Sequence, residues 1–239
     1  MKFNYHGHSC IEIQTDEVSL IIDPFLTNNP VASVKPEEIK VDYVLLTHGH
    51  DDHILDAPQI AKQNNAQLIS IVELATYMSW KGAQTVGMNL GGTYKTEHFQ
   101  VKMIQALHSS SYTEHDNQNI VYLGAAAGFI IKIGGLTILH SGDTALFSDM
   151  KMIGKRHQID VAFLPIGDHF TMGPEDAFQA AKWLGARYVV PIHYNTFPPI
   201  RQDGELFINR LAAKGIKGKA LNPGESLSSK EILEALNKR

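Results

Sequence analysis

The feature that most constrains the fold is a cluster of histidines and aspartates directly after an apolar segment. Residues 41–46 read Val-Asp-Tyr-Val-Leu-Leu, which is typical of a short buried strand, and residues 47–53 read Thr-His-Gly-His-Asp-Asp-His. Neutral imidazoles and carboxylates are the ligands that Zn²⁺, Mn²⁺ and Fe²⁺ accept at neutral pH. The pattern therefore predicts a metal-binding loop at the carboxyl end of a strand, and the fold must bring further ligands to that end.

The expected strands and helices follow one plan that occurs twice. Three strands of alternating polarity open the chain as a meander, and units of a buried strand followed by a helix come next. The second half repeats this order, beginning with a hairpin through a Gly-Gly pair. Such an order predicts two sheets packed face to face with helices outside both. We therefore expect a four-layer αββα sandwich, of α/β class or α+β in some schemes.

We expect a single domain over residues 1–239, because no linker rich in proline, glycine or serine interrupts the chain, with two halves meeting near residue 117. Residues 87–92 are expected to form a glycine-rich turn and residues 109–115 a loop. The expected strands are residues 2–5, 10–14, 18–22, 43–46, 67–71, 99–107, 128–133, 136–140, 161–165 and 187–191, and the expected helices are residues 56–63, 73–80, 145–155, 175–184, 205–213 and 230–237.

Composition limits the classes of partner. The net charge is −4 and the basic residues are scattered, which argues against a surface that neutralises the phosphates of a nucleic acid. The lone Cys10 cannot form an intramolecular disulfide, the first residues do not read as a signal peptide, and no apolar stretch approaches the ~20 residues of a membrane span. We expect a cytoplasmic protein with a small-molecule substrate, without nucleic acid or membrane, that could form a homo-oligomer.

Three other residues of metal-ligand type follow expected strands. His108, Asp143 and His193 each come within three residues of the end of such a strand. Sites in layered α/β folds collect their residues from the carboxyl ends of strands. Within residues 48–53, the first two imidazoles leave the strand on one side and the later carboxylate and imidazole sit about a turn further along, so one loop can serve two ions. The sequence thus predicts one site built from four segments.

In order, spacing and context these motifs resemble the metallo-β-lactamase superfamily, whose fold is the αββα sandwich. The resemblance covers nearly the whole chain. It implies that Asp143 bridges two ions and that Asp23 and Thr47 orient the imidazoles. The implied ligands are His48, His50 and His108 for one ion, and Asp52, His53 and His193 for the other.

Four further segments are similar to those of small metal-dependent hydrolases, a branch that resembles the ascorbate-6-phosphate lactonases. They are residues 5–10, 22–25, 167–174 and 191–196. Another branch, the flavodiiron oxygen reductases, places a carboxylate where His50 stands. The pattern of this chain therefore favours hydrolysis over redox chemistry.

The resemblance implies a binuclear metal-dependent hydrolase that cleaves a small ester, lactone or phosphodiester. Two divalent ions, Zn²⁺ first with Mn²⁺ or Fe²⁺ as alternatives, would share a hydroxide that attacks the substrate, so no protein nucleophile is required. Asp143 and Asp52 are the expected catalytic carboxylates. Asp143 fixes the separation of the ions, and Asp52, a metal-bound water or a loop histidine protonates the leaving group.

Two other functions stay open. A nucleic-acid phosphodiesterase or ribonuclease would use the same ligands, although the chain is short and lacks a basic stripe. A non-catalytic metal-binding sensor would use the sandwich as a binding module, although sensors can discard ligands and this set is complete. A glutathione thioesterase would need a basic cluster for the carboxylates of the tripeptide, and the sequence shows none.

Several residues near the expected site are candidates for substrate contact. For His8 the sequence leaves two readings open, a pocket residue and a hydrogen-bonded structural histidine. His6 and His140 favour the structural reading, and Cys10 on an apolar strand is expected to pack in the core. The expected substrate-binding residues are His8, His115, His169, Thr171 and Asn195.

Overall fold

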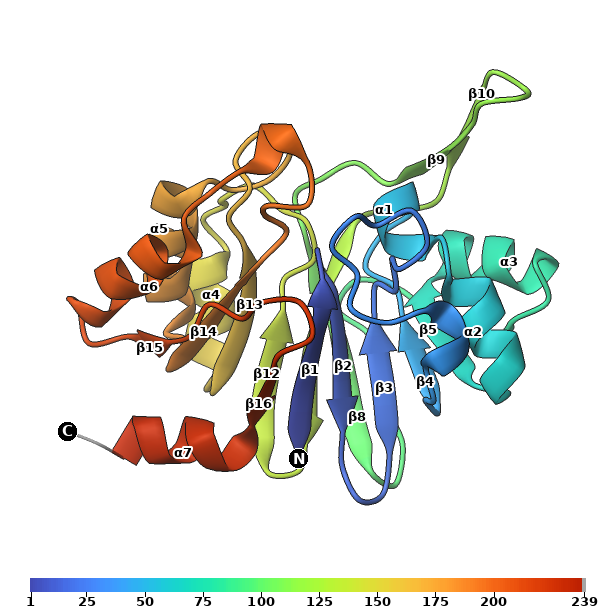
Figure 1. The fold of residues 1–239 in the computed structure, drawn as a ribbon. Coiled ribbons are helices and arrows are strands. Elements are labelled where there is room, and N and C mark those ends of the chain that lie inside the picture. The colour runs from blue at the N-terminus through green and yellow to red at the C-terminus, as the bar shows by residue number, and fades with distance from the viewer. Residues whose placement is uncertain (238–239) are drawn as a thin grey trace.

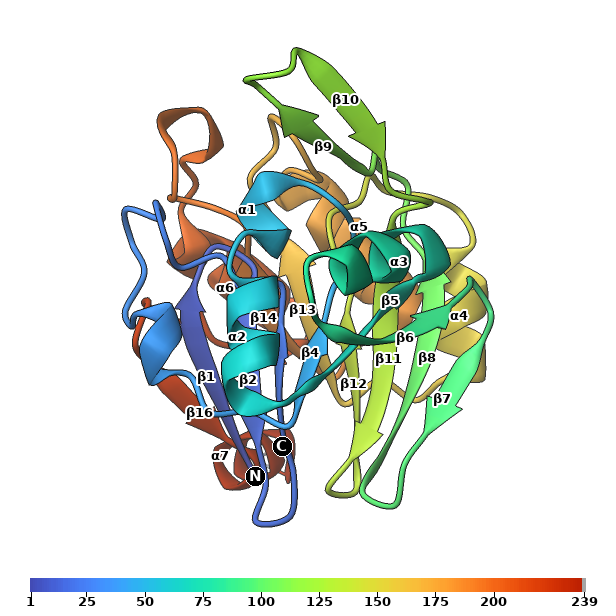
Figure 2. The same cartoon turned by 90° about the vertical axis from the view of Figure 1, so that its right-hand side faces the viewer.

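The chain folds into two seven-stranded sheets packed face to face, with helices outside both (Figures 1 and 2). The computed structural model describes residues 1–237. The first sheet has the order β16-β1-β2-β3-β4-β5-β6, and the second has the order β15-β14-β13-β12-β11-β8-β7. The predicted αββα sandwich is confirmed.

The first sheet is built mainly from the amino-terminal part of the chain, and a carboxy-terminal strand closes its edge. Its helices are α1 (Asp51–Ile54), α2 (Ala57–Asn64) and α3 (Val72–Trp80). Its strands are β1 (Lys2–Gly7), β2 (Cys10–Gln14), β3 (Ser19–Ile22), β4 (Tyr43–Leu45), β5 (Gln67–Ile71), β6 (Gln84–Met88) and β16 (Ser226–Ser228).

The second sheet starts at β7, so the chain passes from one sheet to the other between Met88 and Thr93 and not near residue 117. A separate hairpin, β9 (Ser111–Glu114) and β10 (Asn119–Tyr122), extends from the body (Figure 1). The other elements are β7 (Thr93–Lys95), β8 (Phe99–Gln105), β11 (Ala127–Ile133), β12 (Leu136–His140), α4 (Met150–Arg156), β13 (Val161–Pro165), α5 (Pro174–Leu184), β14 (Tyr188–Ile192), α6 (Gly204–Ala212), β15 (Lys217–Gly218) and α7 (Ser229–Asn237), with short 3₁₀ turns at Pro36–Glu38 and Pro198–Ile200.

Strand direction decides where the loops meet. Strands β3 to β6 pair in parallel, and so do β12 to β15. Strand β1 runs in the same direction as β3, because both are antiparallel to β2. Strand β8 runs in the same direction as β12, because both are antiparallel to β11. Within the first sheet the carboxyl ends of β1 and β4 therefore lie at the same edge, and within the second sheet so do those of β8, β12 and β14.

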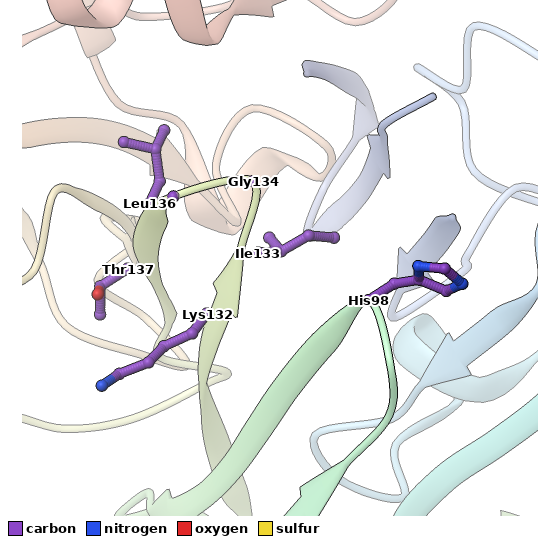
Figure 3. A pocket seen from close by; sticks show the side chains of 7 residues that line it. His98, Lys132, Ile133, Gly134, Leu136 and Thr137 are labelled. Carbon is purple, nitrogen blue, oxygen red and sulfur yellow. The ribbon is translucent and has the colours of Figure 1, made fainter. Parts of the chain in front are cut away.

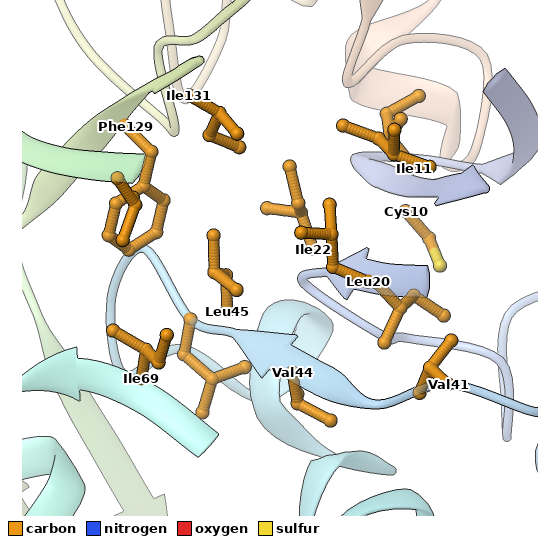
Figure 4. Close-up of a cluster of buried hydrophobic side chains, with 14 of the residues drawn as sticks. Cys10, Ile11, Leu20, Ile22, Val41, Val44, Leu45, Ile69, Phe129 and Ile131 are labelled. Carbon is orange, nitrogen blue, oxygen red and sulfur yellow. The ribbon is translucent and has the colours of Figure 1, made fainter. Parts of the chain in front are cut away.

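The main core lies between the sheets, where alternate residues of each strand point inward (Figure 4). Leu45 and Ile69 of the first sheet and Phe129 of the second are buried there, and Phe3 meets Phe163 across the interface with ring centroids 5.8 Å apart. Cys10 is fully buried in the same core, which confirms the packing reading. The shared core fixes the sheets and holds the strand ends in register.

Two expectations for local structure were wrong. The helix expected over residues 145–155 begins only at Met150, because the Ala145 amide donates to the Leu107 carbonyl instead of starting a helix, and residues 148–149 form a turn. The loop expected over residues 109–115 contains β9, which the hairpin turn pairs with β10. Among residues 1–237, no helix is long and apolar enough to cross a membrane.

Candidate metal centre

Four histidines and one carboxylate from four segments converge at the carboxyl ends of the strands. The Oδ2 atom of Asp143 lies 3.0 Å from Nε2 of His193, 3.3 Å from Nε2 of His53, 3.7 Å from Nε2 of His108 and 3.9 Å from Nε2 of His48. A single carboxylate oxygen thus faces four imidazole nitrogens. The convergence expected from the sequence is present, with Asp143 at its centre.

The ligand-type atoms around Asp143 form three groups that could each hold an ion, and the third, of Asp23, His48 and His53, shares residues with the other two. One group has nitrogen atoms of His48, His50 and His108 within 4.8 Å of one another. A second has atoms of Asp52, His53 and His193 within the same limit, together with His8. The first two groups contain the residues that the resemblance implies for two ions, with His8 added to the second, and the assignment of ions to them stays a prediction.

The cluster contains buried polar atoms that no protein group satisfies. Nε2 of His53 and Oδ1 of Asp143 are buried and lack a hydrogen-bond partner among the described residues. A buried donor or acceptor without a partner costs about 1–3 kcal/mol. Because imidazole nitrogens and carboxylate oxygens are the ligands of divalent transition metals, a bound ion would satisfy these atoms, and the residues present fit the metal that the sequence implies.

Asp23 sets the orientation of the imidazoles next to Asp143. Its Oδ2 atom accepts hydrogen bonds from Thr47 Oγ1 at 2.6 Å and from His53 Nδ1 at 2.9 Å, and its Oδ1 atom accepts one from the Thr47 amide at 2.8 Å. The Thr47 hydroxyl, which donates to Asp23, accepts from His48 Nδ1 at 2.9 Å. Both imidazoles therefore donate an Nδ1 hydrogen to this pair and direct Nε2 into the cluster, where it can bind a cation once it carries no hydrogen.

Electrostatics favour the ligand form of His48, His50, His108 and Asp143, but not that of His53. Burial lowers the pKa of His48 well below its usual value, and burial also lowers the pKa values of His50 and His108. Burial alone would raise the pKa of Asp143, but the facing His193 and His53 hold it well below its usual range. Burial alone would lower the pKa of His53, but Asp143, Asp23 and Asp52 raise it well above its usual value, so His53 holds a proton next to these carboxylates. Neutral imidazoles and an ionised carboxylate are the forms that bind a cation, so a cation bound at His53 would displace that proton.

The backbone is strained where it delivers these side chains. His8, Asp23 and His193 have φ angles of 55°, 49° and 52°, in the left-handed region that residues other than glycine rarely adopt. Gly142, at φ 61°, turns the chain into Asp143, and a Cβ atom there would collide with the carbonyl oxygen of Ala127. Only glycine allows the β12 end to approach so closely.

A hollow of about 590 Å³ opens beside His108. Its wall contains Ser109, whose Oγ lies 3.2 Å from His50 Nε2, and Ser110, whose Oγ accepts from the Gly49 amide at 3.1 Å. The remaining lining is neutral as well: Leu90, Gln105, Ala106, Ser111, Tyr122, Gly124, Ala125 and Ala126. Sequence reasoning did not select the two serines, although their position directly after the candidate ligand His108 was a usable signal.

A second hollow, of about 340 Å³, lies at the opposite end of the strands, around the turn between β11 and β12 (Figure 3). Its charged or titratable side chains, His98 and Lys132, are both exposed. It lacks a buried polar group and lies far from the ligand-bearing strand ends. We do not consider it a candidate site.

None of the five expected substrate contacts lines the hollow beside His108. His115 is exposed at the tip of the β9–β10 hairpin, and His169 is exposed on the loop after β13. Thr171 is half-buried and its hydroxyl donates to the Met172 carbonyl; the Asn195 side chain accepts from the Gln202 amide. Their contact with substrate stays a prediction.

His140 and His8 are both buried and hydrogen-bonded near the cluster. His140 is fully buried, with Nε2 donating to the Ser9 carbonyl at 3.0 Å and Nδ1 accepting from the Gly142 amide at 3.2 Å, which confirms the structural reading. His8 is also fully buried and contacts Asp52. His8 is therefore buried next to Asp52, His53 and His193, whereas His115 and His169 are exposed.

Comparison with known proteins agrees with this geometry. Residues 2–193 match the family described as the beta-lactamase superfamily domain. A UPF0173 metal-dependent hydrolase of Geobacillus thermodenitrificans is 55% identical over 95% of this chain and 99% of its own length, and YtkL of Bacillus subtilis, of the same description, is 52% identical over 95% and 99%. The chain belongs to the UPF0173 metal-dependent hydrolases of the beta-lactamase superfamily.

Solved structures place this hydrolase in the same fold. Igni18, described as a metallo hydrolase from Ignicoccus hospitalis, superimposes with a TM-score of 0.85 at 38% identity, over 95% of this chain and 97% of that one. An isothiocyanate hydrolase from Delia radicum gut bacteria has a TM-score of 0.75 at 20% identity, over 95% and 98%, which shows a shared fold alone. The link to the ascorbate-6-phosphate lactonases stays a prediction.

Proposed function

We propose that this chain is a binuclear hydrolase of a small, uncharged ester or lactone. The observation that carries the proposal is the convergence of four imidazole nitrogens on Oδ2 of Asp143, together with the buried, unpartnered atoms on His53 and Asp143. We infer that Asp143 lies between two divalent ions. His48, His50 and His108 would hold the first ion, and Asp52, His53 and His193 the second.

When bound, the two ions would lower the pKa of a shared water toward neutrality and polarise the scissile carbonyl. The protein groups then have three tasks. Asp143 fixes the geometry between the two ligand groups, and the Asp23–Thr47 pair holds the imidazoles of His48 and His53 in the required tautomer. The neutral hollow beside His108 receives the substrate.

Asp52 is the carboxylate best placed to handle a proton. About one third of its side chain is exposed, unlike that of the buried Asp143. Burial would raise the pKa of Asp52, but the neighbouring His53 and the hydrogen bond from His8 hold it below its usual value. Asp52 is therefore ionised before reaction, and it can accept a proton from the attacking water and return it to the leaving group.

The lining of the hollow favours an uncharged substrate over a phosphodiester. Apart from the ligand His108, none of its lining side chains is a lysine, arginine, aspartate or glutamate. A phosphodiester or a nucleic acid strand carries negative charge beyond the scissile group, which a basic wall would have to neutralise. Ser109 to Ser111 and Tyr122 offer hydroxyls to a neutral carbonyl or ring oxygen.

The test is a matched set of substrates on the protein loaded with Zn²⁺ or Mn²⁺. We expect kcat/KM for p-nitrophenyl acetate or a simple lactone to exceed that for bis(p-nitrophenyl) phosphate by at least about tenfold, a difference of about 1.4 kcal/mol. Faster cleavage of the phosphodiester or of single-stranded RNA would overturn the choice of substrate class. Two bound ions without turnover of any of these substrates would favour the sensor.

A further inference from the structure

His8 has an unusual position for a residue outside the implied ligand set. It follows β1 directly, is fully buried, and lies against all three residues that the proposal assigns to the second ion alone. Its Nε2 atom is 3.2 Å from Oδ2 of Asp52. Its ring centroid is 4.1 Å from that of His193 and 5.5 Å from that of His53, the latter edge-to-face.

The hydrogen bonds of His8 define its tautomer. An ionised carboxylate only accepts, so Nε2 of His8 carries the hydrogen that faces Asp52. The opposite nitrogen, Nδ1, lies 2.8 Å from Oγ1 of Thr196, which is itself buried and can donate its hydroxyl hydrogen. A chain of donors therefore runs from Thr196 through His8 to Asp52.

The main chain of His8 is tied to the same group. Its carbonyl accepts a hydrogen bond of 2.8 Å from the amide of His193, and both residues have left-handed backbone angles. Such angles cost about 1–3 kcal/mol unless the surroundings enforce them. The side chain of His8 thus supports Asp52, and its backbone supports His193, across 185 residues of sequence.

We propose that His8 is a positioning residue that orients Asp52 and His193 and thereby sets the affinity of the second metal site. The inference rests on the proposed two-ion function. Supporting groups of this kind typically change metal affinity by about 10- to 100-fold when they are removed. His8 leaves the first group of His48, His50 and His108 untouched, since neither of its ring nitrogens contacts them.

The chain offers a closely matched control. His6, two residues earlier on β1, is buried and also bonds a carboxylate and a hydroxyl: its Nε2 is 2.9 Å from Glu12 and its Nδ1 is 3.2 Å from Ser33. None of these three residues belongs to the metal cluster. Loss of His6 therefore reproduces the structural cost of removing a buried, hydrogen-bonded imidazole without touching the ligands.

The experiment is calorimetric titration of the metal-free, full-length protein with Zn²⁺. In His8→Asn, whose new side chain tolerates the left-handed angle, we expect the second equivalent to bind about 10- to 100-fold more weakly while the first is unchanged. Thr196→Val should also weaken binding of the second equivalent of Zn²⁺. Thr196→Ser, which keeps the hydroxyl next to His8, should bind it with wild-type affinity. His6→Gln should leave both equivalents as in the wild type.

The outcomes separate this inference from the proposed function. If wild-type protein binds fewer than two ions, the two-ion proposal fails. If the wild type binds two ions, and His8→Asn either binds both with wild-type affinity or loses both equally, the positioning role of His8 is wrong while the two-ion proposal stands. A Zn²⁺-loaded crystal structure with Nε2 of His8 within about 2.1 Å of an ion would make His8 a ligand and would also overturn the inference.

Discussion

Asp143→Asn is expected to abolish hydrolysis while the fold persists. The substitution replaces one oxygen of the carboxylate with an NH2 group. The resulting amide faces the four imidazole nitrogens without a charge, and its nitrogen presents hydrogens where a cation would bind. We expect kcat to fall by at least about 10³-fold, which corresponds to about 4 kcal/mol of lost transition-state stabilisation. The measurement is kcat on the best ester or lactone, with circular dichroism as the check on folding.

The control for this variant is Asp149→Asn, the same chemical change on an exposed aspartate just before α4. Its activity should equal that of the wild type. A rate for Asp143→Asn within tenfold of the wild-type rate would show that the carboxylate does not lie between the ions. Loss of the circular dichroism signal would instead call for the smaller change Asp143→Glu, which keeps the charge and should retain measurable activity.

Asp23→Asn is expected to damage both stability and metal binding. The buried Asp23 accepts three hydrogen bonds, and an amide in its place would turn a donor toward the Thr47 hydroxyl and Nδ1 of His53. The free energy of unfolding of the metal-free protein should fall by about 2–4 kcal/mol. The His53 ring would lose the acceptor that keeps Nε2 free, so kcat/KM should fall about 10- to 100-fold.

Urea denaturation and steady-state kinetics measure the two effects. Asp42→Asn is the matched control, because Asp42 also accepts from a backbone amide and a hydroxyl, both of Ser19, but is exposed. It should cost less than about 1 kcal/mol and leave kcat/KM unchanged, since exposed polar groups regain hydrogen bonds to water. Equal losses in the two variants would mean that Asp23 has no special role at the cluster.

The sequence predicted the sandwich and the convergence of the ligands because both depend on strong local signals. Residues 41–53 combine a buried strand with a dense ligand motif, and the ends of β8, β12 and β14 each carry a ligand-type residue. Parallel strands place their carboxyl ends together, so local patterns were sufficient to predict that these side chains converge.

The features that were missed depend on contacts between distant residues. Strand β16 has three residues, Ser-Leu-Ser, and forms only because Leu227 pairs with Phe3 at the other end of the chain. The start of α4 is delayed by a hydrogen bond between Ala145 and Leu107. The role of His8 was left open because its partner Thr196 lies 188 residues away. Local patterns carry no information about such pairs.

The central claim is that two metal ions bind on either side of Asp143. The most direct test is elemental analysis of protein saturated with Zn²⁺ and freed of excess metal by gel filtration, combined with an anomalous difference map from crystals of the same sample. We predict two ions per chain, about 4 Å apart, with the Asp143 carboxylate between them. A single ion, or two ions bound away from residues 48–53, would contradict the account.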